Sequence, residues 1–285
     1  MRRCRLDEWL LDDLCRVYLP LAAWLDRMKG RSALVLGVNG AQGSGKSTLC
    51  EFLTLVLRHG YGHRIVGFSI DDLYKTRAER TQLAAGIHPL LETRGAPGTH
   101  DVELGLSLID QLITAGPDDV TRIPSFDKAL DERRPESDWP AHDGPTDIII
   151  LEGWCVGAKP QPESDLTRPV NTLEASEDPD GVWRHHVNMK LALDYSRLFA
   201  RLDKLIMLKV PGMESVYQWR AIQERKLAAA LDPDGRNRIM DDTALRRFIM
   251  HYERLTCAML QEMPQRADLV LELDKHHRFT HIGVN

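Results

Sequence analysis

The chain has 285 residues, of which 43% are hydrophobic and 28% are charged, values typical of a globular protein that can bury a sizeable core. Its formal net charge of -5 argues against bulk electrostatic attraction to nucleic acid or to an anionic membrane, so neither partner is expected. The five cysteines are scattered and form no C-x-x-C pair, which indicates neither a disulfide framework nor a zinc site and fits a reducing, cytoplasmic location.

The first residues are apolar but do not predict a membrane span. Asp12, Asp13 and Arg16 interrupt them, and no stretch in the chain approaches the roughly eighteen apolar residues that a span needs. We expect residues 1–30 to form a helical extension, broken near Pro20 because proline disrupts a helix interior.

From residue 33 onward, strand-like runs alternate with segments of helical periodicity. This pattern predicts an α/β fold in three layers, with a central, mostly parallel sheet flanked by helices. The expected strands are 33–38, 64–70, 120–124, 147–151, 204–210 and 268–273.

Two helices and one irregular segment stand out between these strands. Apolar residues spaced three or four apart predict a helix after Asp101, its expected N-cap, and another over residues 242–263. Residues 156–183 are rich in proline, serine and acidic residues and are expected to form a long loop or a small excursion.

The stretch Asn39–Thr48 matches the phosphate-binding pattern G-x-x-x-x-G-K-[ST] between an expected strand and an expected helix. Its glycines allow backbone N–H groups to point inward, and the helix N-terminus favours an anion. Lys46 would reach the outer phosphates of ATP, and the Ser47 hydroxyl would bind Mg²⁺. The expected nucleotide-binding residues are Gly40, Ala41, Gln42, Gly43, Ser44, Gly45, Lys46, Ser47 and Thr48.

Carboxylates follow two of the expected strands. Asp71 and Asp72 come after the second strand, at the edge where such sheets bind ligands, and Asp71 could take the proton of an acceptor hydroxyl. Glu152 ends the run 147–151 and is expected to be a second magnesium ligand. A turn or helix cap for the aspartates, and a solvated strand end for Glu152, are the simpler alternatives. No [NT]-K-x-D guanine-binding motif is present, which disfavours a GTPase.

These segments, with three others, carry a family resemblance. In order and spacing they resemble the P-loop kinases of the phosphoribulokinase, uridine kinase and bacterial pantothenate kinase superfamily, and most of all the plant-type D-glycerate 3-kinases with their bacterial and fungal relatives. The segments are Asn39–Thr48, Ser69–Tyr74, Arg94–Asp101, Pro124–Lys128 and Ile150–Trp154, with further likeness from Val216 to Tyr252.

The resemblance implies one P-loop kinase domain over residues 1–285, with a substrate-side excursion at 156–190 and a lid at 214–240. It implies that Asp71 is the catalytic base and that the lid arginines Arg220 and Arg225 approach the transferring phosphoryl group, although a solvated helix face is the alternative for both. The residues that it places at the acceptor pocket are Asp72, Tyr74, Arg94, His100, Asp101, Lys128 and Tyr217.

The function expected from these observations is ATP-dependent phosphorylation of a small-molecule hydroxyl, with D-glycerate as acceptor and 3-phosphoglycerate as product. The cofactors are ATP and Mg²⁺, and Arg94 or Lys128 could hold the substrate carboxylate. A pantothenate- or uridine-type kinase of the same fold, or an ATP-binding regulatory protein without transfer activity, stays open. The sequence does not indicate the oligomeric state.

Overall fold

The computed structural model describes residues 8–230 and 240–285. The strands are β1 (Leu34–Gly40), β2 (Ile65–Ser69), β3 (Val120–Arg122), β4 (Phe126–Asp127), β5 (Glu132–Arg133), β6 (Ala141–Asp143), β7 (Ile148–Gly153), β8 (Lys204–Lys209), β9 (Leu269–Leu273) and β10 (Phe279–Val284). The α-helices are α1 (Glu8–Asp13), α2 (Leu19–Met28), α3 (Lys46–Tyr61), α4 (Arg77–Gly86), α5 (Val102–Thr114), α6 (Glu163–Leu166), α7 (Thr172–Glu177), α8 (Val182–Lys190), α9 (Ser196–Phe199), α10 (Met213–Ala230) and α11 (Asp242–Glu262).

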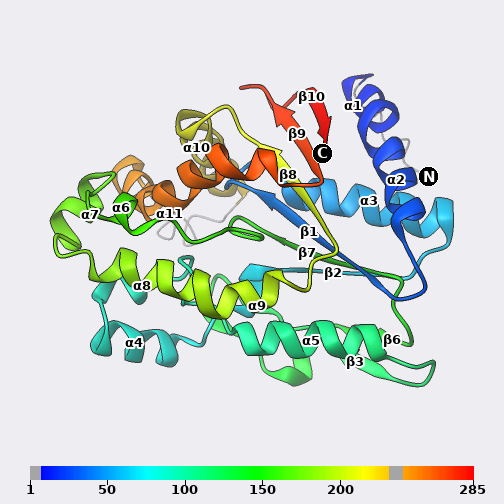
Figure 1. Ribbon diagram of the computed structural model, residues 1–285, viewed down its shortest axis with the longest axis horizontal. Coiled ribbons are helices and arrows are strands. Elements are labelled where there is room, and N and C mark those ends of the chain that lie inside the picture. The colour runs from blue at the N-terminus through cyan, green and yellow to red at the C-terminus, as the bar shows by residue number, and fades with distance from the viewer. Residues whose placement is uncertain (1–7, 231–239) are drawn as a thin grey trace.

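Six strands form the central sheet, in the order β10-β9-β8-β1-β7-β2 (Figure 1). Neighbouring strands from β9 to β2 run parallel, which confirms the predicted sheet. Strand β10 was not predicted; it pairs antiparallel with β9 at the edge. Its side chains are mostly exposed, so it lacks the hydrophobic pattern by which the other strands are recognised.

Side chains along each strand alternate between two hydrophobic cores, one on each face of the sheet. On β1, Leu34, Leu36 and Val38 pack with α2 and α3, whereas Val35 packs on the opposite face with α5, α9 and α11. Helices therefore cover both faces, as expected for a parallel sheet, and the fold is the three-layer α/β arrangement that the sequence predicted.

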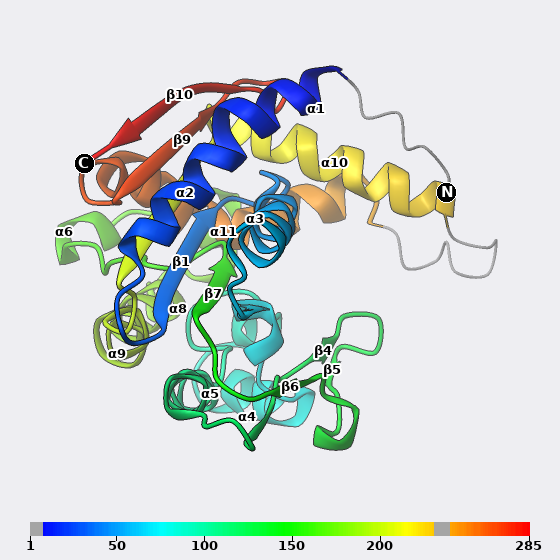
Figure 2. The same ribbon diagram turned by 90° about the vertical axis from the view of Figure 1, so that its right-hand side faces the viewer.

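The expected strand at residues 120–124 does not join the central sheet. Strand β3 is shorter, Val120–Arg122, and pairs only with β6, because Val120 and Arg122 are exposed and only Thr121 is buried. The prediction that it belongs to the main sheet was wrong. Figure 2 shows β4, β5 and β6 with α4 and α5 at one end of the view, and α1, α2 and β10 at the other.

The amino-terminal helix is continuous past Pro20. A π-helical turn, Leu14–Tyr18, joins α1 to α2 shortly before Pro20, which lies in the first turn of α2. The wider turn accommodates the proline ring and its missing N–H, so the chain stays helical. The predicted break was wrong for that reason. Across the two described ranges, every helix is too short or too polar to cross a membrane.

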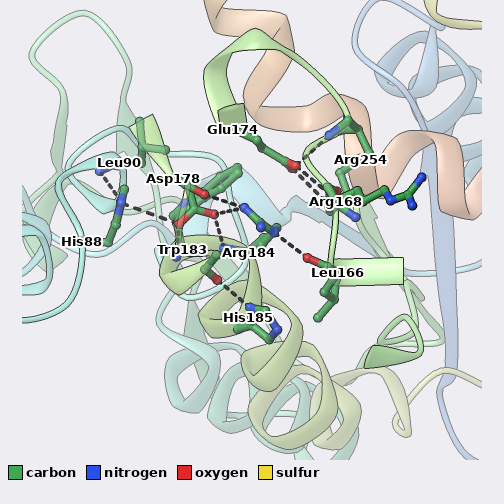
Figure 3. A network of polar contacts seen from close by, with 12 residues as sticks. His88, Leu90, Leu166, Arg168, Glu174, Asp178, Trp183, Arg184, His185 and Arg254 are labelled. Carbon is green, nitrogen blue, oxygen red and sulfur yellow. Dashed lines mark hydrogen bonds and ion pairs between the residues drawn. The ribbon is translucent and has the colours of Figure 1, made fainter. Parts of the chain in front are cut away.

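Residues 156–190 contain three helices, α6, α7 and α8, so residues 156–183 form the excursion rather than one long loop. Buried ion pairs hold these helices, as Figure 3 shows: Arg184 contacts Asp178 at 3.0 Å, and Arg254 of α11 contacts Glu174 at 2.7 Å. Arg184 also donates to the Leu166 carbonyl at 2.6 Å. Of the acidic residues in this segment, Glu174 and Asp178 are buried in this network, whereas Glu163, Asp165, Glu177 and Asp180 are exposed.

Candidate active site

The loop Asn39–Thr48 has the strand-loop-helix geometry of a phosphate site. Gly43 and Gly45 adopt positive φ angles of 77° and 91°, which side-chain-bearing residues rarely adopt, and a Cβ at Gly43 would lie 2.9 Å from the Cβ of Trp219. Helix α3 begins at Lys46, so its free N–H groups open onto the loop. The Ser44 hydroxyl is buried without a hydrogen-bond partner among the described residues, which suits a site that an anion completes.

Asn39 anchors this loop to the chain that follows β7. Its buried amide donates to the carbonyls of Trp154, at 3.1 Å, and Val156, at 2.8 Å. The sequence prediction included Asn39 in the quoted stretch but gave it no role, because an anchoring contact to a segment more than one hundred residues away leaves no local pattern.

Ser47 and Glu152, the two residues predicted to bind magnesium, lie next to each other at the loop. The Ser47 hydroxyl lies 2.9 Å from a Glu152 carboxylate oxygen, and Lys46 Nζ donates to the Ala41 carbonyl at 3.2 Å. Hydroxyl and carboxylate oxygens are the ligand types that Mg²⁺ takes beside nucleotide phosphates, so this pair fits a phosphate-bound metal. In the part of the chain that the structure describes, no cluster of three or more histidine, cysteine or acidic side chains could hold a metal unaided.

Asp71 lies just beyond β2, on the other side of β7 from the phosphate loop. In the sheet register Glu152 is paired with both Val38 of β1 and Ser69 of β2, so the loop and Asp71 flank it. Lys128 Nζ lies 2.5 Å from Asp71 Oδ2, and the Tyr74 hydroxyl donates to Asp71 Oδ1 at 2.8 Å. Burial alone would raise the pKa of the Asp71 carboxyl, but the Lys128 ammonium, with smaller contributions from His100 and the Tyr74 hydroxyl, holds this pKa below its ordinary value.

Two of the predicted acceptor residues have their carboxylates engaged in local structure. Asp72 accepts from the backbone N–H groups of Ser69, at 3.0 Å, and Phe126, at 3.4 Å. Asp101 caps α5 through the Leu104 N–H, at 3.1 Å, as the sequence predicted. Both carboxylates therefore stabilise the local backbone, and the contacts of Asp72 match the turn alternative.

His100 is buried beneath Tyr74, on which its ring stacks with centroids 4.6 Å apart. The Gly98 N–H donates to the Tyr195 hydroxyl oxygen at 3.0 Å, so we assign the Tyr195 proton to His100 Nδ1, 2.5 Å away. This assignment leaves the proton of the neutral ring on Nε2, which has no partner among the described residues. Burial lowers the pKa of His100 to about 4, although the Asp71 charge opposes the shift.

Arg94 and Lys128 lie close together, but the Arg94 side chain is held by more contacts than the Lys128 side chain. Arg94 forms an ion pair with Asp131, lies 5.7 Å from the centroid of the Phe126 ring, and contacts the Lys128 carbonyl at 3.4 Å. Lys128 is 60% exposed and directs its ammonium to Asp71. Sequence reasoning did not find Asp131, whose φ is 55° and which has no motif around it.

The two arginines predicted on the lid helix, Arg220 and Arg225, have different surroundings. Arg220 pairs with Glu224 at 2.5 Å and lies 5.5 Å from the centroid of the Phe248 ring. Arg225 is exposed and contacts the Ala221 carbonyl of its own helix at 3.3 Å. The predicted lid segment 214–240 is helical through Ala230, and residues 231–239 lie outside the described residues.

Tyr217 contacts α11 rather than the Asp71 group. Its hydroxyl is hydrogen-bonded to Asp242, and the guanidinium of Arg246 lies 4.1 Å from the centroid of its ring. Neither of these contacts supports the acceptor-pocket role that the resemblance implied for Tyr217.

A contact with the phosphate loop comes from the turn between β9 and β10. His277 Nε2 lies 2.7 Å from the Gly43 carbonyl, and its ring stacks on Trp219 with centroids 3.8 Å apart. Trp219 donates to the Lys275 carbonyl at 3.1 Å. The start of α10, the phosphate loop and the β9–β10 turn therefore form one packed unit.

Known proteins resemble this chain in both sequence and structure. The uncharacterized kinase mug58 of Schizosaccharomyces pombe is 35% identical over 226 residues, which cover 76% of this chain and 78% of that protein. The chain belongs to this kinase family. No family model matches it. The chloroplastic D-glycerate 3-kinase of Arabidopsis thaliana is 26% identical across 95% of this chain, and the match spans 66% of that protein.

A solved structure shares the fold of this chain. The solved structure of D-glycerate 3-kinase from Cryptococcus neoformans superposes with a TM-score of 0.76 at 24% identity, over 97% of this chain and 99% of that one. The protein is thus an ATP-dependent small-molecule kinase, as the sequence predicted. Kinases of this fold use ATP with a divalent metal.

Proposed function

We propose that this kinase transfers the γ-phosphoryl group of ATP to a hydroxyl of D-glycerate and releases 3-phosphoglycerate and ADP. The observation that supports this most is the position of Asp71, which flanks Glu152 on one side while the phosphate loop flanks it on the other. A carboxylate in this position can accept the proton of an acceptor hydroxyl that is directed at the terminal phosphate of ATP. Two proteins that resemble this chain over 95% and 97% of its length are named D-glycerate 3-kinases.

In the proposed reaction, the acceptor oxygen forms a bond to the γ-phosphorus while its proton passes to the Asp71 carboxylate. The bond from the γ-phosphorus to the β,γ-bridging oxygen breaks, and ADP leaves. Lys46 and Arg220 would offset charge on the transferring group, and Arg225 stays a prediction for the same role. Ser47 and Glu152 would hold Mg²⁺, which neutralises charge on the phosphate oxygens when bound.

The acceptor would lie between Asp71 and the segment Arg94–Asp101. The Nε2–H of His100 is a buried donor without a partner in the described part of the chain, so it can donate to an oxygen of the bound acceptor. We further propose that residues 156–190 support this side of the site, that 214–240 act as the lid of a single domain, and that the protein is cytoplasmic.

The test offers purified protein and Mg-ATP three acceptors in parallel, D-glycerate, pantothenate and uridine, and follows ADP release. We expect turnover with D-glycerate, with 3-phosphoglycerate identified by NMR. Turnover with pantothenate or uridine alone would replace the acceptor. Release of ADP at the same rate with and without every acceptor would contradict acceptor phosphorylation itself.

A further inference from the structure

The proposed base is already occupied by a cation. Lys128 Nζ lies 2.5 Å from Asp71 Oδ2, and the Tyr74 hydroxyl takes Oδ1 at 2.8 Å. Each oxygen of the carboxylate thus has a partner, one of them a positive charge. Each oxygen can still accept a second hydrogen bond. The carboxylate is nevertheless a weaker base while the Lys128 ammonium contacts it, because the positive charge stabilises its ionised form.

Of the two partners, Lys128 is the one that can move. Its side chain is 60% exposed on the turn between β4 and β5, whereas Tyr74 is buried and stacked on His100. An exposed ion pair contributes little net stability, so a competing anion can take over the ammonium at small cost.

The turn that carries Lys128 is itself fixed. Asp131, on the same turn, accepts from the fully buried Arg80 at 2.9 Å and also pairs with Arg94. Arg94 in addition contacts the Lys128 carbonyl at 3.4 Å. Arg94 therefore holds the hairpin, and the long, flexible stem of Lys128 is free to redirect its charge over a few ångströms.

We propose that Lys128 selects acceptors that carry a carboxylate near the reacting hydroxyl. In the free kinase its ammonium holds Asp71 Oδ2; when the acceptor binds, the substrate carboxylate takes the ammonium, and Asp71 Oδ2 becomes free to accept the hydroxyl proton. A hydroxy acid provides this exchange, whereas a neutral polyol or nucleoside leaves the base paired. This inference rests on the proposed function and assigns the acceptor class.

Electrostatics favour the exchange in the direction proposed. Two carboxylates, one from Asp71 and one from the acceptor, repel each other unless a cation lies between them. The exchange also weakens the contact that holds the pKa of Asp71 low, and its burial then makes the carboxylate a stronger base. Recognition of the anion and release of the base thus occur together.

The experiment compares D-glycerate with glycerol, which lacks the carboxylate, in the wild type, Lys128→Met and Lys128→Arg. For Lys128→Met we expect kcat/KM with D-glycerate to fall roughly 10- to 150-fold, mainly through KM, the factor for loss of one charged hydrogen bond. We expect kcat/KM with glycerol to rise, because the Lys128 ammonium no longer masks the base. Lys128→Arg should keep part of the preference.

The matched control is Lys204→Met, which breaks an ion pair with Asp268 at the amino end of β8, the opposite edge of the sheet from the phosphate loop. It should leave the ratio of the two kcat/KM values unchanged. An unchanged ratio in Lys128→Met, or an equal loss for both acceptors, would overturn the proposal. Wild-type turnover with uridine or glycerol as fast as with D-glycerate would also overturn it and leave the kinase function intact.

A binding measurement separates this inference from catalysis. With a non-hydrolysable ATP analogue bound, D-glycerate should raise the Tm of the wild type and of Lys204→Met but not of Lys128→Met. The same shift in Lys128→Met, or none in the wild type, contradicts the role of Lys128. A shift that depends on Lys128, in a protein without turnover, would support this inference and reject the proposed function.

Discussion

Two ion pairs of the same chemical kind occupy opposite situations in this kinase. Asp71 and Lys128 are 25% and 60% exposed at the candidate site, whereas Glu174 and Arg254 are 0% and 9% exposed between α7 and α11. A pair open to water can exchange partners at small cost, but removal of one member of a buried pair leaves an uncompensated charge. The ion pair between Asp71 and Lys128 can therefore change partners, whereas the ion pair between Glu174 and Arg254 cannot do so without a large loss of stability.

Asp71→Asn would break the exposed pair with the largest expected effect. We expect kcat to fall about 10²- to 10⁴-fold, because the amide cannot accept the hydroxyl proton, while the Tm changes little. Steady-state kinetics with Mg-ATP and thermal unfolding measure the two quantities. Asp110→Asn, at an exposed position on α5, is the control and should keep full activity. Near-normal turnover of Asp71→Asn would remove Asp71 from the role of base.

Glu174→Gln should show the opposite result, a loss of stability with little change in the kcat of the folded fraction. The buried Arg254 guanidinium loses its counter-charge, which costs about 3–5 kcal/mol in the free energy of unfolding. Glu177 offers a matched control on the same short helix, since it pairs with Arg247 of α11 at 2.7 Å but is 40% exposed. Glu177→Gln should cost at most about 1 kcal/mol in urea unfolding. Equal costs would contradict the contrast between the two regions.

Buried His100, which lies close to Asp71, should make the stability of the protein depend on pH. Its pKa is about 4 in the folded state, mainly through burial and with a smaller effect of Lys75, against 6.5 ordinarily. Because the unfolded chain takes up a proton that the native state refuses, stability should fall as pH drops from about 6.5 towards about 4. The His100 share is about 3 kcal/mol.

Urea unfolding between pH 7.5 and 4.5 measures this dependence in the wild type and in His100→Gln. The variant should lose stability less steeply, and a remaining slope is expected because burial also lowers the pKa values of His186 and His251. Parallel curves for the two proteins would show that His100 does not resist protonation.

Tyr74→Phe should give the smallest effect and sharpens the description of the exposed pair. The lost hydroxyl no longer donates to Asp71, so the pKa of that carboxyl rises, and the acid limb of the kcat/KM profile moves to higher pH by less than about one unit. Tyr252→Phe is the matched control, since its hydroxyl donates to the Arg94 carbonyl at 3.4 Å. A shift of equal size in both variants would exclude a specific effect on Asp71.

The elements predicted correctly are those whose side chains repeat a local pattern. Strands β1, β2, β7, β8 and β9 are buried and apolar, and α5 and α11 have apolar residues at helical spacing with Asp101 and Asp241 as caps. Strand β10 and the π-helical turn at Leu14–Tyr18 were missed, because an exposed edge strand and a widened turn depend on neighbours rather than on their own composition.

The candidate site divides in the same way. Sequence by itself determined the phosphate loop, since glycine at positive φ, a lysine and a hydroxyl at a helix N-terminus are requirements of the local backbone. It indicated Glu152 only as the carboxylate that ends a buried strand. Only the tertiary structure decided that Lys128 rather than Arg94 contacts Asp71, that Asp131 holds Arg94, and that Tyr217 contacts α11. These partners lie 25 to 57 residues apart, and side-chain pairing at such distances depends on how loops pack, which no local pattern encodes.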